Sequence, residues 1–171
     1  KTMKVLLKNV RLSFPSLFKT EQYAGEDTEK YAATFLIPKS DTKTVTAIEQ
    51  ACKQALVEKY GEGKVPKGFK MPLVDGDDKE YQGYADCVCI KANTKKRPTL
   101  VNRDKTPIVE EDGILYGGCY VNASIDVWVM DNSYGKKVLA NLNAIQFVKD
   151  GESFGTKSDG ADDFDDLDDE F

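Results

Sequence analysis

The sequence Y-G-G-C-Y-V-N-A-S-I-D-V-W-V-M, residues 116–130, is the clearest strand signal in the chain. Apolar and polar residues alternate along it, which is typical of a β-strand with one buried face. The apolar face comprises Cys119, Val121, Ala123, Ile125, Val127 and Val129. The opposite face comprises Tyr120, Asn122, Ser124, Asp126 and Trp128. A turn at 131–135 and a returning strand over 137–148 follow, so this stretch predicts the first half of a long β-hairpin.

The two large aromatic residues on the polar face of this strand, Tyr120 and Trp128, allow two interpretations. Aromatic rings on a half-exposed strand can stack on nucleic-acid bases. Alternatively, both rings pack beneath a loop and belong to the core. The pattern alone does not separate the two.

Further strands and one helix are predicted outside the hairpin. Strands are expected over 3–13, 31–37 and 83–92, although the alternation in the first is imperfect. A helix capped by Ser40 or Asp41 runs to about Tyr60, and Gly61 ends it. The pattern predicts a mainly β fold with one α-helix. A small barrel of the oligonucleotide-binding (OB) class fits both the strands and the distribution of charge and aromatic residues.

Positive charge is concentrated in one predicted loop, residues 93–105, N-T-K-K-R-P-T-L-V-N-R-D-K. Counted from Lys91, the segment holds six basic residues against Asp104, a net charge of +5. The basic residues are Lys91, Lys95, Lys96, Arg97, Arg103 and Lys105. A solvated loop would explain them, but such a cluster is also typical of a surface that binds a nucleic-acid backbone.

The last thirteen residues, D-G-A-D-D-F-D-D-L-D-D-E-F, contain eight acidic residues and no basic one. The whole chain has 24 basic and 29 acidic residues, net −5; without these eight acids it has 24 against 21, net +3. We therefore divide the chain into a binding domain, 1–152, and a disordered acidic tail, 153–171. The tail is either a solubilising terminus, or an arm that imitates nucleic acid or docks on a partner through Phe164, Leu167 and Phe171.

Several classes of function lack sequence support. The chain has no histidine, which excludes Ser-His and Cys-His nucleophilic sites and histidine general bases. It has neither a P-loop nor a G-x-G-x-x-G motif, and we expect no cofactor. Without a long apolar run or a signal-peptide plan, a cytosolic protein is expected. The four cysteines, Cys52, Cys87, Cys89 and Cys119, are then expected to be reduced and buried, an all-cysteine zinc site being the remote alternative.

Several short segments of the sequence resemble a family of tailed-phage single-stranded-DNA-binding proteins. They are N-V-R-L-S-F-P-S-L-F (9–18), P-L-V-D-G-D (72–77), R-P-T-L-V-N-R-D (97–104), I-L-Y-G-G-C-Y-V-N-A-S-I-D-V-W (114–128) and Y-G-K-K-V-L-A-N-L-N-A-I-Q-F-V-K-D-G (134–151). The resemblance spans nearly the whole domain. It implies an OB fold, sequence-independent binding of single strands, and an acidic tail that often ends in an aromatic residue. The chain departs from the family pattern at Gly117, where a proline is usual, and at Asn102, where an aspartate is usual.

The leading hypothesis is a single-stranded-DNA-binding protein of phage replication or recombination, acting in the bacterial cytoplasm and not an enzyme. The basic residues from Lys91 to Lys105 would bind phosphates. Bases would stack on Tyr116, Tyr120, Trp128, Phe14 and Phe18. The acidic tail would recruit replication or recombination proteins.

Two alternatives remain open. The first is a metal-dependent nuclease whose carboxylates converge in the fold. Its candidates are Asp75, Asp77, Asp78, Asp126, Glu110 and Glu111. The second is a DNA mimic or adaptor that acts through the tail, for which a basic loop would be superfluous.

Overall fold

The computed structural model of the chain describes residues 3–154. In chain order the elements are β1 (Met3–Ser16), β2 (Gln22–Tyr23), β3 (Glu26–Asp27), β4 (Tyr31–Pro38), α1 (Thr42–Tyr60), β5 (Leu73–Asp75), η1 (Gly76–Asp78), β6 (Cys87–Thr94), β7 (Thr99–Val101), η2 (Glu110–Asp112), β8 (Tyr120–Asn132) and β9 (Gly135–Lys149). The predicted mainly β fold with one α-helix is confirmed. The tail prediction, including Phe164, Leu167 and Phe171, lies outside the described residues.

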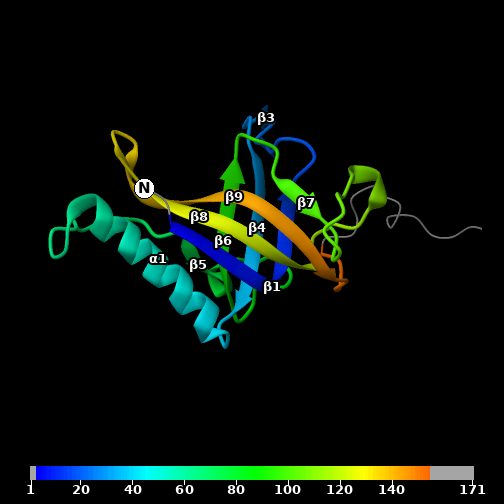
Figure 1. Ribbon diagram of the computed structural model, residues 1–171, viewed down its shortest axis with the longest axis horizontal. Coiled ribbons are helices and arrows are strands. Elements are labelled where there is room, and N and C mark those ends of the chain that lie inside the picture. The colour runs from blue at the N-terminus through cyan, green and yellow to red at the C-terminus, as the bar shows by residue number, and fades with distance from the viewer. Residues whose placement is uncertain (1–2, 155–171) are drawn as a thin grey trace, which may run out of the picture.

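Five long strands close into a small barrel (Figure 1). β1 pairs antiparallel with β4 and β8, β4 pairs with β6, and β8 pairs with β9. A parallel pairing of β6 with β9, through Asn93 and Asn141, completes the circle. A five-stranded barrel with this order of pairing is OB-like. Short strands extend it: β5 pairs with β6, and β7 runs parallel to β9.

Two bulges explain why the alternation in β1 is imperfect. The register shifts between Leu7 and Val10, where Asn9 has a left-handed backbone (φ 53°). Leu7 and Val10 are therefore both buried although they are three residues apart. A second shift between Ser13 and Ser16 carries the strand three residues beyond its predicted end. At that bulge Phe14 has φ 45° and its ring is 56% exposed.

The helix forms where it was predicted. Asp41 caps it by accepting hydrogen bonds from the Thr44 amide (3.3 Å) and hydroxyl (2.8 Å). Gly61, at φ 102°, ends it with a hydrogen bond to the Val57 carbonyl. The helix packs on β1 and β8 with a buried face of Ile48, Cys52, Ala55 and Leu56. It therefore lies away from the β4–β6 side of the barrel (Figure 1).

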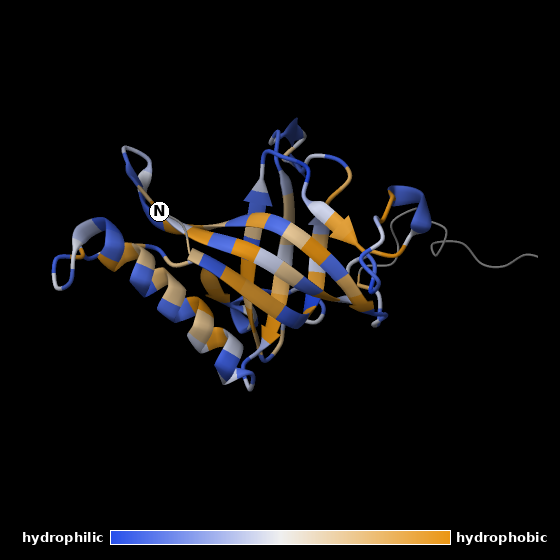
Figure 2. Cartoon of the chain, viewed as in Figure 1, coloured by the Kyte–Doolittle hydropathy of each residue, from blue (hydrophilic) through white to orange (hydrophobic). Residues whose placement is uncertain are grey.

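The core lies inside the barrel and beneath α1. The inward faces of the strands supply it, and the alternation appears in Figure 2 as orange and blue bands along β8 and β9. Of the four cysteines, all without a disulfide, Cys52, Cys89 and Cys119 are buried and Cys87 is half-buried. No helix in the described part of the chain is long and apolar enough to span a membrane.

Candidate nucleic-acid interface

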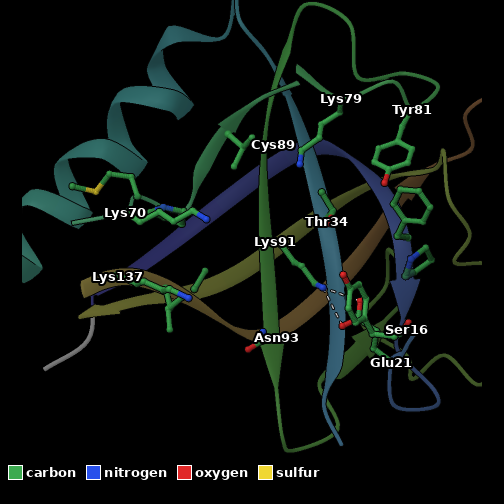
Figure 3. Close-up of a pocket in the computed structure, with 18 of the residues that line it drawn as sticks. Ser16, Glu21, Thr34, Lys70, Lys79, Tyr81, Cys89, Lys91, Asn93 and Lys137 are labelled. Atoms are coloured by element: carbon green, nitrogen blue, oxygen red, sulfur yellow. Dashed lines mark hydrogen bonds and ion pairs between the residues drawn. The ribbon is translucent and has the colours of Figure 1, made fainter. Parts of the chain in front are cut away.

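An open groove of about 750 Å³ crosses the β4–β6 side of the barrel (Figure 3). β4 and β6 form its floor with Thr34, Cys89, Lys91 and Asn93. The β1 bulge, the β2–β3 segment, the connection around β5 and the start of β9 supply the sides. In an OB barrel, the second and third strands of the barrel and the loops beside them form the usual oligonucleotide-binding face. The groove occupies that face.

Four lysines line the groove: Lys70, Lys79, Lys91 and Lys137. Lys70 and Lys137 are neighbours, because the Lys70 amide donates to the Lys136 carbonyl (3.0 Å) and the Lys70 carbonyl accepts from the Val138 amide (2.9 Å). Among residues 3–154, only Lys91 of these four forms an ion pair, with Glu21 at 2.8 Å. Glu21 is also the single acidic residue among the described lining residues. The groove is therefore electropositive, which suits a polyanion.

Aromatic rings stand together along one side of the groove. Phe14 meets Tyr81 edge-on at 4.9 Å between ring centroids, and Tyr81 meets Tyr84 at 5.2 Å. Tyr84 is buried, which raises the pKa of its phenol, and its hydroxyl hydrogen-bonds to Ser13 (2.8 Å). Tyr81 is 54% exposed, and Tyr23, from the β2–β3 hairpin, is 74% exposed. Phe14, Tyr23 and Tyr81 thus present ring faces or edges to anything bound in the groove.

The structure brings only part of the sequence-predicted site to this groove. Lys91 and Phe14 line it. Lys95 and Lys96 are exposed immediately beyond β6 but are not among the residues that line the groove. Their contact with phosphates stays a prediction.

Four other predicted residues lie around β7. Arg97 donates to the Phe18 carbonyl (2.9 Å), and both residues line a second, smaller hollow of about 450 Å³. Arg103 donates to the Val148 carbonyl at the far end of β9, and Lys105 is exposed in the same turn. These residues lie apart from the groove, whose β9 residues are Lys137 to Ala140.

The three aromatic residues predicted from the central hairpin do not line the groove. The Tyr116 hydroxyl donates to Asp150 Oδ1 (2.9 Å) and accepts from the Gly151 amide (3.0 Å). Tyr116 therefore binds the segment that follows β9. The Arg11 guanidinium lies 5.5 Å and the Lys149 ammonium 4.8 Å from the centroid of the Tyr120 ring. Trp128 is half-buried, and its backbone pairs with that of Leu139, a groove residue. Their roles in stacking stay predictions.

Sequence reasoning missed Lys70, Lys79, Lys137, Tyr23 and Tyr81. The first two and Tyr81 lie in the long connection 61–82, which contains a basic first half and a flanking tyrosine. Long connections of this kind are often functional. The length and charge of this connection could have indicated that Lys70, Lys79 and Tyr81 lie near a site. No comparable feature of the sequence points to Lys137 or Tyr23.

The carboxylates proposed for a nuclease lie on separate elements. Asp75 and Asp77 both pair with Lys39, at 2.8 and 2.6 Å, and the lysine holds the pKa of each carboxyl below its ordinary value. Glu110 and Glu111 are in η2, and Asp126 is in β8. Within residues 3–154 no three histidine, cysteine or acidic side chains are grouped so as to hold a metal ion.

The fold and the groove define an OB-like barrel with an open, lysine-lined and aromatic-edged face, the arrangement of a single-strand-binding module. Residues 3–171 match the family described as "Enterobacter phage Enc34, ssDNA-binding protein". The chain belongs to this family of phage single-stranded-DNA-binding proteins, as the sequence resemblance indicated.

Individual relatives agree with the family assignment. The chain is 41% identical to putative protein p50 of Acyrthosiphon pisum secondary endosymbiont phage 1, over 96% of this chain and 94% of that protein. The structure of the bacteriophage Enc34 single-stranded DNA-binding protein in complex with ssDNA superposes with a TM-score of 0.77, at 28% identity and 89% coverage of both chains. The bacteriophage T7 protein gp2.5 shares the fold, with a TM-score of 0.61 at 15% identity over 97% of both chains.

Proposed function

We propose that this protein binds single-stranded DNA without sequence preference in the groove on the β4–β6 face. The main observation in support of this proposal is the groove itself, which combines four lysines with the exposed aromatic residues Phe14, Tyr23 and Tyr81. Lysines bind phosphates regardless of sequence, and every base has a face on which a ring can stack. The ssDNA complex of the Enc34 protein supports the proposal, because this chain superposes on that protein over 89% of both chains.

The path of the strand is set by the positions of the charges. Lys70 and Lys137 lie on one side of the groove, Lys91 on its floor, and Lys95 and Lys96 beyond the end of β6. Tyr81, with the Phe14 ring 4.9 Å away, stands on the side of the groove opposite Lys70 and Lys137, where both rings can meet the bases of the strand (Figure 3). The loop lysines predicted from sequence then contact phosphates at one end of the path, and Lys70 and Lys137 contact phosphates at the other.

The experiment is a titration of labelled single-stranded and duplex oligonucleotides at moderate salt, each with and without Mg²⁺. We expect the single strand to bind more tightly, since stacking needs unpaired bases, and to remain intact in Mg²⁺. Equal affinity for both forms would remove the stacking part of the proposal. Cleavage that depends on Mg²⁺ would favour the nuclease alternative.

We assign the acidic tail a double role, as competitor of DNA and as handle for a replication or recombination protein of the phage in the host cytoplasm. The described chain ends at Phe154, which packs in a cluster with Tyr84 and Cys89, two residues that line the groove. Covalent attachment at this place keeps the charge of the segment from Asp159 to Phe171 at high local concentration beside the lysines.

Truncation after Lys157 tests the first role and Phe171→Ala tests the second. Truncation removes eight acidic residues and should tighten DNA binding several-fold at low salt but little at high salt. Phe171→Ala leaves every charge in place, so DNA affinity should stay constant while recruitment falls. If truncation leaves DNA affinity unchanged at all salt concentrations, the competition does not occur.

A further inference from the structure

One carboxylate enters the otherwise basic groove. Both Glu21 carboxylate oxygens accept hydrogen bonds from Lys91 Nζ, at 2.8 and 3.0 Å (Figure 3). The Glu21 side chain is 21% exposed and that of Lys91 is 50% exposed. Lys91 projects from the groove floor. A DNA phosphate that is neutralised by Lys91 must therefore approach this part of the floor. Without DNA, this lysine is paired with a group of the same charge sign as a phosphate.

Glu21 belongs to the segment that carries Tyr23. Its amide donates to the Lys30 carbonyl (2.7 Å) and its carbonyl accepts from the Thr28 amide (2.9 Å), so the backbone of Glu21 forms the base of the β2–β3 hairpin. The hairpin thereby fixes the Glu21 backbone at a position from which its carboxylate reaches Lys91. Tyr23, two residues further on, lines the same groove and is the more exposed of the two.

We propose that Glu21 is a built-in phosphate surrogate, which closes the β2–β3 hairpin onto Lys91 in the free protein and is exchanged for a DNA phosphate on binding. This inference rests on the proposed single-strand binding in the groove. A carboxylate and a phosphate cannot share one lysine without mutual repulsion, so the ion pair opposes binding at this position. Its loss frees the hairpin to move with Tyr23 against the bound strand.

Lys91 differs from the other groove lysines because it already has a carboxylate partner. Lys70, Lys79 and Lys137 form no ion pair among the described residues, so a phosphate binds them without displacing a carboxylate. At Lys91 the phosphate must replace Glu21. Glu21 therefore weakens phosphate binding at this position and makes the dependence of affinity on salt less steep.

The test compares Glu21→Gln with Glu29→Gln by titrating fluorescein-labelled oligo-dT into the full chain at low and high salt. Both variants remove one negative charge from the same hairpin segment, but Glu29 is exposed and does not line the groove. We expect Glu21→Gln to tighten binding about two- to fivefold at low salt, the range of a partly exposed ion pair, and the salt slope to steepen by up to about 0.7. Glu29→Gln should change affinity little.

A second pair of variants shows whether Glu21 acts through Lys91. In a Lys91→Met background Glu21 has no lysine to occupy, so Glu21→Gln should give no gain in affinity. An equal gain in both backgrounds, or equal gains from Glu21→Gln and Glu29→Gln, would reduce Glu21 to one more surface charge and overturn the proposal. If neither the wild type nor any variant binds oligo-dT, the proposed function fails instead, which is a distinct result.

Discussion

Replacing Lys70 and Lys137 together with glutamine should make DNA binding markedly less sensitive to salt. Lys70, in the connection between α1 and β5, is a neighbour of Lys137 on β9, and both lysines line the groove. Neither forms an ion pair among residues 3–154, so glutamine leaves no opposite charge unpaired. The substitutions therefore remove phosphate contacts while the barrel is expected to stay intact.

The magnitude depends on the number of lysines. Each phosphate neutralised on a single strand contributes about −0.7 to the slope of log K against log salt. Removing two groove lysines should therefore make the slope shallower by about 1.4. Between 50 and 200 mM salt, the double variant should then lose about 7-fold less affinity than the wild type.

The assay is fluorescence anisotropy of labelled oligo-dT at four or more salt concentrations, with urea unfolding to verify that stability is unchanged. A second variant for comparison replaces Lys95, Lys96 and Arg97 with alanine in the loop after β6. If these residues continue the path of the strand, that variant also gives a shallower slope. A slope that is unchanged in the Lys70/Lys137 variant but shallower in the loop variant would move the binding surface away from the groove and refute the reasoning.

Two further predictions concern stacking and acid stability. Tyr81→Ala should cost about 1–3 kcal/mol of DNA affinity if the exposed ring stacks on a base. Tyr120→Ala should cost less in the same titration. Equal losses for the two variants would indicate that the β8 face is also a stacking surface. Lys39 holds the pKa values of Asp75 and Asp77 below 3.8, so the stability they contribute is present above that pH and is lost as the pH falls through their lowered pKa values. Urea unfolding from pH 6 to pH 2 should therefore show that Lys39→Met lowers stability near neutrality and that the difference narrows in acid, and a constant difference would contradict the linkage.

Much of the fold could be predicted because its signals are local. The alternation in β8 is carried by consecutive residues, and the helix has its cap at Asp41 and its end at Gly61 within the sequence. The short strands were missed because two or three residues cannot show a period. β2 and β3 are defined by the tight turn at Ala24 and Gly25, both with positive φ, and β5 and β7 by the neighbours they pair with.

The imperfect alternation of β1 could be seen in the sequence but not explained by it. A bulge at Asn9 shifts the inward face by one residue, and its cause is partly tertiary, since the Asn9 amide donates to the Asn122 side chain on β8 (2.9 Å). The second bulge, at Phe14, could not be explained from the sequence either, and it affects the site. It turns an aromatic residue of a core strand outward, where its ring meets Tyr81.

The candidate site was only partly predicted because barrel closure, not sequence order, assembles it. Charge density along the chain points to residues 91–105, and of the basic residues there only Lys91 lines the groove. Lys137 is 46 positions later, yet it reaches the same groove because β9 returns to pair with β6 at Asn93 and Asn141. Lys70 joins it through two backbone hydrogen bonds that link its segment to the start of β9. Single-strand binding needs charges spaced along a path through space, and in this fold that path crosses several strands. On the proposed path, the basic run in the sequence marks one end, and the parallel contact that closes the barrel determines where the other end lies.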